Sequence, residues 1–297
     1  MPSPTSPIHG KLANLYRLRP NGFKGGGLND ITWGTGYSGA DAAYFEVEID
    51  AEATPDTFKW RQDGGAYTED VAITGAAQTL AEGQTVIFSA TTGHLLADRW
   101  MVGNFKDELC SESGSQAQVT EATRRLLNPN NPPTFTDDGG ANVLTVDNVR
   151  GLATFDANVG AVDVDGNLGW IPRAALEKVG YLLGWSLDLS VDMADASCCG
   201  QNWKTSLPGQ SGGSGSAEAF FIGGDSGLDS LIEAAAGDEK YCLLELFVND
   251  PDQDQTGDHL SLWAVVSGVS HSTSVGDIVK EPITFQVHGF VGFNVDA

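Results

Sequence analysis

The sequence has few basic residues and no long apolar segment. Lysine and arginine number 16, whereas aspartate and glutamate number 40, so the formal net charge is −24. No apolar run reaches the roughly 18 to 20 residues that a membrane-spanning helix requires. Residues 1–20 contain no apolar signal core after a basic start. These absences predict a soluble protein that is neither inserted in a membrane nor exported by a signal peptide.

Cysteine is also scarce. The four cysteines, Cys110, Cys198, Cys199 and Cys242, show neither a CxxC spacing nor the density of a disulfide framework. This usage fits a protein made in a reducing cytosol. We interpret the adjacent pair Cys198-Cys199 as two small apolar side chains, with a ligand role as the alternative.

The acidic charge is unevenly distributed. Residues 1–150 carry a net charge of −8 and residues 151–297 a net charge of −16. Such a surface repels nucleic acid, because binding requires protein cations to displace the counterions of the phosphates. Ordinary DNA binding is therefore disfavoured, whereas a passage through which DNA slides without sticking is compatible with the charge. The alternative interpretation is that the acidity only keeps the protein soluble.

The sequence shows no signature of an enzyme, a cofactor or a metal centre. Its 5 histidines have no HxH or HExxH spacing. The GSG at 213–215 lacks the strand–turn–helix context of a serine nucleophile, and the GGG at 25–27 is not followed by a P-loop lysine. The 40 acidic residues produce many accidental carboxylate pairs, and no pair stands out as that of a glycan hydrolase.

The stretch NDPDQDQTGDH resembles a calcium-binding loop at first sight. Asp250, Asp252 and Asp254 match the first, third and fifth positions of such a loop. The sharp turn would require glycine where Gln255 stands, and the bidentate ligand would be glutamate where Ser261 stands. Strand-like segments flank the stretch, so we predict an acidic hairpin tip. Binding of a cation by the clustered carboxylates stays open as the alternative.

Short strands separated by glycine-rich turns dominate the first part of the chain. Strands are predicted at 44–50, 56–62, 71–74, 84–90 and 98–105. Spacings near ten residues are typical of a β-sandwich module. The aromatic residues expected in its core are Phe58, Trp60, Phe88 and Trp100. The alternative is that one or two of these rings are exposed for binding.

The second part is predicted to be antiparallel β with one helix packed on it. In WSLDLSVDM, apolar residues alternate with Ser186, Asp188, Ser190 and Asp192, as in a half-buried strand. Segments 171–180 and 225–237 are the helix candidates, and the second is the stronger because Gly237 provides a C-terminal stop. Strands are predicted at 142–149, 151–159, 181–193, 217–223, 240–248, 259–270 and 281–295.

Two segments between the strands have a distinct composition. Residues 111–135 include a polar stretch and the turn-rich NPNNPP, so we predict a linker there. In so acidic a chain, Arg124 and Arg125 within it are expected to pair with carboxylates of the same subunit or of a neighbour. Residues 195–217 lack periodicity but include Trp203, which favours an ordered loop that docks on a neighbour.

The run GWSLDLSVDMADASCCGQNWKTSLPGQSGGSGSAEAFF at 184–221 resembles the core of major tail tube proteins of long-tailed bacteriophages. Those chains combine a tryptophan-bearing strand, an aspartate-rich turn, a W-x-x-x-L-P-G loop and an aromatic strand. The closing VKEPITFQVHGFVGFNVDA at 279–297 resembles the final strand pair of that family. The matching residues are Trp185, Asp188, Asp192, Asp195, Trp203, Leu207, Pro208 and Gly209.

The resemblance implies a tail-tube-type β-sandwich or partial barrel with one flanking helix. Residues 1–20 would be an arm or first strand of this domain, and residues 136–297 its main part. Residues 21–110 are similar to a β-sandwich module that recurs in phage structural proteins, as an appended or inserted decoration. The linker at 111–135 would separate the two.

The resemblance also implies how copies assemble. Rings of six subunits would stack and join their inner sheets into a continuous tube. Asp188 and Asp192 would line the lumen, and the 195–217 loop would reach the next ring through Trp203, Leu207 and Pro208. Charge contacts between subunits would join Arg124 and Arg125 to the acidic tip that contains Asp250, Asp252, Asp254 and Asp258.

The function that follows is a structural virion protein of the phage tail, with no enzymatic activity and no cofactor. The implied partners are further copies of the chain, the tape measure, tail terminator and distal tail proteins, and DNA that passes without sticking. Assembly would occur in the cytoplasm of the bacterial host. One alternative is a phage decoration or adhesin protein that binds host-surface glycans. Another is a carboxylate-dependent glycan hydrolase.

Overall fold

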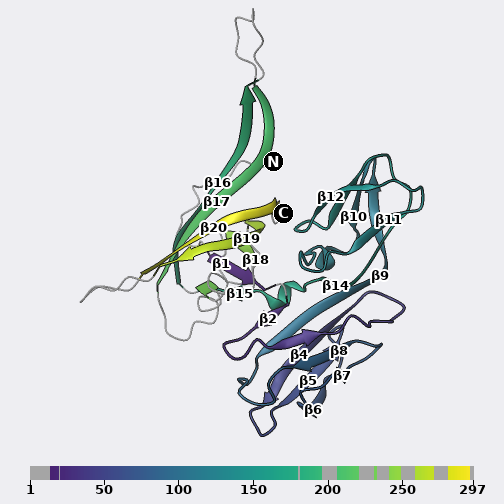
Figure 1. Cartoon of the computed structure of the whole chain (residues 1–297), viewed down its shortest axis with the longest axis vertical. Coiled ribbons are helices and arrows are strands. Elements are labelled where there is room, and N and C mark those ends of the chain that lie inside the picture. Colours follow the sequence, from purple (N-terminus) through teal and green to yellow (C-terminus); the bar gives the residue numbers. More distant parts are fainter. Residues whose placement is uncertain are drawn as a thin grey trace, which may run out of the picture.

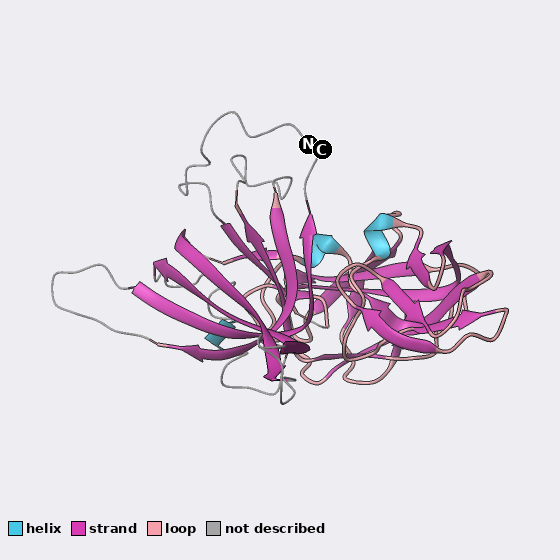
Figure 2. Cartoon of the chain, turned by 90° about the horizontal axis from the view of Figure 1, so that it is seen from above, coloured by secondary structure: helices cyan, strands magenta, loops and turns pink. Residues whose placement is uncertain are grey.

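The computed structural model describes residues 14–19, 21–179, 181–195, 206–220, 231–232, 241–248, 258–270 and 280–294. These residues form an almost entirely β structure, and the predicted mainly-β fold is confirmed. Three antiparallel sheets contain seven, ten and three strands. Figure 1 shows the seven-stranded sheet on one side and the other strands on the other, and Figure 2 shows both groups from above. In the part described, no helix is long and apolar enough to cross a membrane.

The seven-stranded sheet joins one N-terminal strand to the C-terminal part of the chain. Its strand order is β15-β1-β18-β19-β20-β17-β16, with β15 and β16 at the two edges. β1 is buried along its whole length because it lies between β15 and β18. The strands are β1 (Asn14–Leu18), β15 (Glu177–Lys178), β16 (Tyr181–Asp195), β17 (Ser206–Phe220), β18 (Cys242–Phe247), β19 (His259–Val269) and β20 (Lys280–Asn294).

The remaining strands lie between residues 23 and 170 and form the other two sheets. The ten-stranded sheet contains β2 (Phe23–Lys24), β4 (Ala43–Ala51), β5 (Thr57–Gln62), β6 (Thr68–Ala72), β9 (Arg99–Ser113), β10 (Gln116–Val119), β11 (Thr134–Asp137), β12 (Val143–Asp147), β13 (Leu152–Phe155) and β14 (Val162–Trp170). The three-stranded sheet contains β3 (Ile31–Trp33), β7 (Gln78–Thr79) and β8 (Thr85–Phe88).

The long strand β9 connects most of this region. It pairs with β2, β4, β10 and β14 at different points along its length. The polar stretch that begins at residue 111, which the composition predicts to be part of a linker, therefore continues strand β9 and forms the hairpin from β9 to β10. Its polar residues are exposed, whereas Cys110, Ala117 and Val119 alternate with them and are buried. Strands β11 to β14 likewise pair within the ten-stranded sheet and not within the seven-stranded one.

Separate apolar cores lie beneath these sheets. Phe58, Phe88 and Trp100 are fully buried, as the sequence predicts, and they pack between the ten-stranded and three-stranded sheets. Trp60 is only partly buried. A second core, which includes Leu244 and Phe285, packs against the seven-stranded sheet.

The helix predicted at 171–180 is wrong. The segment forms a 3-10 turn, η3 (Arg173–Ala175), followed by the short strand β15. Glu177 and Lys178 pair with Arg17 and Tyr16 of β1, and a continuous helix would remove these residues from the sheet. Of the helix predicted at 225–237, only Leu231 and Ile232 lie within the described residues. Both are helical, and Leu231 is buried.

Candidate functional site

Strands β16 and β17 form a ribbon that extends beyond the seven-stranded sheet (Figure 1). The two strands pair with each other as far as Asp195 and Ser206. β17 also pairs with β20, but only as far as Ser214, whose partner is Gln286. Beyond that position the two strands pair only with each other among the described residues. The outer part of the ribbon therefore has two open backbone edges.

Apolar side chains are exposed on this outer part. Leu189, Val191 and Met193 of β16 are 60%, 46% and 61% exposed, and Leu207 of β17 is 57% exposed. A strand that packs on a core normally buries its apolar face. Since these four residues have no core beneath them, the ribbon carries an apolar strip of the kind that marks an interaction surface.

An apolar cleft opens where β17 and β20 diverge. Its volume is about 530 Å³. Leu189 and Val191 line it from the ribbon, and Val287, Phe290 and Val291 line it from β20. The cleft thus continues the exposed apolar strip onto the neighbouring strand.

The residues predicted to face a lumen lie on the ribbon. Asp188 and Asp192 are both exposed. Alternation along β16 places Asp188 on the face opposite Trp185, whose indole Nε1–H donates a hydrogen bond to the carbonyl oxygen of Phe247 at 3.0 Å. A register shift lies between Val191 and Met193, at the position of Asp192. Alternation therefore places Asp188 on the outward face of the ribbon, and the exposed Asp192 lies at the register shift.

The small-residue tract near 206–217 is a strand where the sequence predicts a loop. Leu207 and Pro208 lie in β17, whereas Trp203 lies outside the described residues. Close packing requires one of its glycines, Gly215. A Cβ built on Gly215 would lie 2.3 Å from Cζ of Phe285, so only glycine fits between this ring and the backbone.

The predicted charge contacts are partly satisfied within the subunit. The Arg124 guanidinium forms an ion pair with Glu108. That of Arg125 donates hydrogen bonds to the carbonyl oxygens of Val119 and Thr120 at 2.8 and 3.1 Å. Asp258 is partly buried at the start of β19. Asp250, Asp252 and Asp254 lie outside the described residues. Among those described, no group of three or more His, Cys, Asp or Glu side chains could hold a metal ion.

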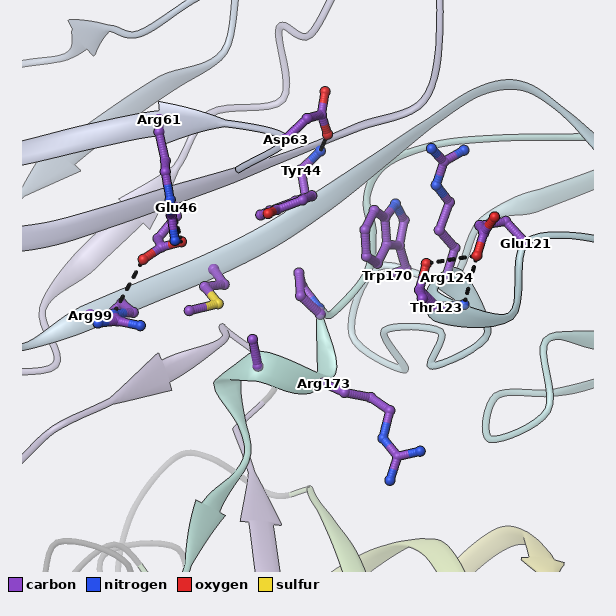
Figure 3. A pocket seen from close by; sticks show the side chains of 13 residues that line it. Tyr44, Glu46, Arg61, Asp63, Arg99, Glu121, Thr123, Arg124, Trp170 and Arg173 are labelled. Atoms are coloured by element: carbon purple, nitrogen blue, oxygen red, sulfur yellow. Dashed lines mark hydrogen bonds and ion pairs between the residues drawn. The ribbon is translucent and has the colours of Figure 1, made fainter. Parts of the chain in front are cut away.

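A pocket that the sequence does not predict lies beside Arg124 (Figure 3). Its volume is about 610 Å³, and Tyr44 and Trp170 form part of its wall with their rings edge to face, 6.0 Å between centroids. Arg61, Arg99, Arg124 and Arg173 also line it. Burial raises the pKa of the Tyr44 hydroxyl, which therefore remains a neutral donor and acceptor.

No protein-family profile and no curated protein sequence matches this chain. Several solved structures are similar to part of it, among them the following three. The tail of an empty GTA particle is 13% identical, with a TM-score of 0.35, over 41% of this chain and 87% of that chain. The SPP1 tail tube is 16% identical, with a TM-score of 0.32, over 39% and 67%. The PVC sheath–tube complex of an extracellular contractile injection system is 14% identical, with a TM-score of 0.32, over 39% and 89%.

Proposed function

We propose that this chain is the subunit of a bacteriophage-type tail tube, a structural virion protein that assembles into stacked hexameric rings. The observation that carries the proposal is the outer part of the β16–β17 ribbon, with its open backbone edges and exposed apolar strip. A two-stranded ribbon alone is marginally stable in water. Exposed strand edges normally pair, become covered or are blocked by charges. A second copy that pairs with the ribbon would supply both backbone partners and apolar cover.

The acidic face of the ribbon suits the inner wall of such a tube. Asp188 and Asp192 are exposed on β16, away from the core of the sheet. In a ring, each copy would contribute these carboxylates to the channel. Their charge would repel DNA phosphates, so that DNA passes through without being retained.

The strand pairing supports two parts of the chain with different roles, a tube-forming unit and an inserted module. The tube-forming unit would comprise residues 14–19 and the strands from β15 to β20, which share one sheet. The strands between residues 23 and 170 belong to the other two sheets. That region would be a module inserted after β1, placed on the outside of the tube.

Further contacts would complete the tail. Trp203, Leu207 and Pro208 would reach the next ring. The acidic tip with Asp250, Asp252, Asp254 and Asp258 would face Arg125 of a neighbour, whereas Arg124 pairs with Glu108 of its own subunit. The tape measure, tail terminator and distal tail proteins would bind inside and at the ends of the tube, assembled in the host cytoplasm and carried in the virion tail.

The proposal is tested by shortening the ribbon. Leu189 and Gly213 are paired, so residues 190–212 can be replaced by a two-residue Asn-Gly hairpin turn. In sedimentation velocity, the full chain should form large particles as its concentration rises, and the shortened chain should stay monomeric with an unchanged circular dichroism spectrum. A full chain that remains monomeric at every concentration would refute self-assembly. A shortened chain that assembles normally would show that the ribbon is not the contact.

A further inference from the structure

The pocket beside Arg124 lies away from the ribbon and is lined by side chains from six elements. Tyr44 and Glu46 come from β4, Arg61 from β5, and Arg99 and Met101 from β9. The turn η2 (Ala122–Arg124) and the residues from the end of β14 to η3 close the other side. Its volume of about 610 Å³ falls within the range of small-molecule sites, roughly 300 to 1,000 Å³.

Two arginines of the pocket, Arg61 and Arg99, form ion pairs with carboxylates that are largely buried. Arg61 donates to Oε2 of Glu46 through Nε at 2.8 Å and Nη2 at 2.6 Å. Nη2 of Arg99 lies 2.7 Å from Oε2 of Glu48. In both pairs the carboxylate is almost buried, whereas the guanidinium is partly exposed. The ion pairs therefore hold the two guanidinium groups in place at the pocket wall.

On the opposite wall, Arg124 pairs with Glu108. The guanidinium of Arg173 points away from the cavity (Figure 3), and its Nη2 lies 2.8 Å from Oε2 of the buried Glu245. The guanidinium groups of Arg61, Arg99 and Arg124, three of the 16 basic residues of the chain, thus lie at one cavity in a protein of net charge −24. A guanidinium is planar and matches a carboxylate with two parallel hydrogen bonds. This wall favours a ligand that contains a carboxylate.

The rim of the pocket also offers acceptors. Asp63 and Glu121 are exposed there, and both also accept local backbone hydrogen bonds, Asp63 from the N–H of Tyr44 and Glu121 from that of Thr123. A molecule with hydroxyl groups would donate hydrogen bonds to them. The rim therefore favours a hydroxylated ligand.

The aromatic wall adds an apolar surface. The half-buried ring of Tyr44 and the side chain of Met101 line the same cavity. Trp170 lies behind Arg124, whose Cζ is 5.9 Å from the ring centroid, and its buried Nε1–H has no acceptor among the described residues.

We propose that this pocket binds a sugar carboxylate, such as a uronic or sialic acid residue. The carboxylate would lie beside Arg124 and the Trp170 indole, the C–H face of the sugar ring against Tyr44, and the hydroxyl groups toward Asp63 and Glu121. A plain anion would not use the rim, and a neutral sugar would leave the guanidinium groups without an anion. The proposal does not depend on tube assembly.

Isothermal titration with the full chain tests the proposal. The probes are glucuronate, galacturonate and N-acetylneuraminate, their methyl esters, which lack the charge, and acetate, which lacks the ring. At least one acid should bind at concentrations up to about 10 mM, which corresponds to a binding free energy of roughly −3 kcal/mol or stronger. Its ester should bind at least about tenfold more weakly, because a charge-assisted pair is lost. Acids that do not bind, an ester that binds as well as its acid, or acetate that competes equally would each overturn the proposal.

Variants locate the binding to the pocket. Arg124→Gln should weaken binding of the acid about tenfold or more, and Arg124→Lys should restore part of it. Arg150→Gln is the matched control, because Arg150 is ion-paired with Asp147 away from this pocket. Thermal unfolding verifies that each variant is folded. If Arg124→Gln destabilises the chain, Tyr44→Ala provides the second variant, with the same expected loss. Binding that is unchanged in both folded variants would show that the sugar binds elsewhere.

Discussion

Ser214 of β17 faces Gln286 of β20 at the last position where these two strands pair. From there to the start of β17 at Ser206, the strand pairs only with β16 among the described residues. This position separates the part of the ribbon that the sheet supports from the part that it does not. The residues beyond it are the ones available to a second copy.

Replacing an exposed apolar residue of the ribbon should block assembly without unfolding the chain. Leu189→Asp places a charge on the apolar strip, where a neighbour would have to bury it. Large particles should disappear in sedimentation velocity, while the free energy of unfolding in urea changes by less than about 0.5 kcal/mol, since the side chain is exposed.

Leu144→Asp is the matched control for this variant. Leu144 is 63% exposed in β12, compared with 60% for Leu189, and lies outside the seven-stranded sheet. It should leave assembly intact. Equal loss of assembly in both variants would indicate a general effect of added charge and not a contact through the ribbon.

Reversing the charge of the outward ribbon face should make the tube retain DNA. In Asp188→Lys/Asp192→Lys, lysines replace the two carboxylates proposed to line the channel and can displace counterions from phosphates. Assembled variant particles should hold short double-stranded DNA at low salt and release it as salt rises, whereas wild-type particles should not. Glu69→Lys/Asp138→Lys makes the same change of charge at exposed positions outside this sheet. Equal DNA retention by that control would contradict a lumen position.

The close packing of Trp170 against Gly103 predicts that substitution of this glycine lowers the free energy of unfolding. A Cβ built on Gly103 would lie 1.9 Å from Cε2 of Trp170, whose ring is almost fully buried. Gly103→Ala should therefore lower the free energy of unfolding by about 1 to 3 kcal/mol through overpacking. Gly184→Ala in β16 meets nothing within 4 Å and should have little effect. Urea denaturation followed by tryptophan fluorescence compares the two variants.

A buried carboxylate near His94 predicts acid sensitivity. Oδ2 of Asp56 lies 3.0 Å from Nδ1 of His94, and Oδ1 of Asp30 lies 3.1 Å from Nε2. Burial alone would raise the pKa of Asp56, but hydrogen bonds from the His94 side chain and from the backbone N–H groups of Ala53 and His94 outweigh it and lower the pKa. The stabilisation is thus present above the unfolded-state pKa of about 3.9 and is lost as the pH falls through the lower folded-state value.

Comparing the wild type with Asp56→Asn isolates this contribution. Asp98 lies nearby, and burial raises the pKa of its carboxyl, so the absolute pH profile contains more than one titration. Subtracting the unfolding free energy of the variant from that of the wild type removes the contribution of groups that titrate in both proteins, such as Asp98. It should be constant near neutral pH and shrink below about pH 4. A difference that does not change with pH would contradict the role of Asp56.

Much of the strand content could be predicted from the sequence, because alternation along a strand is a local property. The apolar and polar faces of β16 are visible in WSLDLSVDM before any partner is known. The helix at 171–180 was wrongly predicted because pairing of Glu177 and Lys178 with β1 joins residues about 160 positions apart. No local sequence pattern indicates this pairing between β1 and β15.

The glycine- and serine-rich start of β17 was predicted as a loop for a related reason. Small residues usually indicate a turn, but here the ring of Phe285 on another strand requires glycine at position 215. The pocket was missed because Tyr44, Arg99, Arg124 and Trp170 come from four separate elements. A cluster of arginines in the sequence of an acidic chain would have indicated the pocket. These arginines, however, are far apart in the sequence and come together only in the fold.

Negative-stain electron microscopy of the concentrated protein tests the central claim most directly. The β16–β17 ribbon predicts hollow cylinders of uniform diameter and variable length, with sixfold symmetry in end views, and their absence when residues 190–212 are replaced by a tight turn. Dispersed single particles at every concentration, from a protein shown to be folded by circular dichroism, would contradict the claim that this chain builds a tail tube.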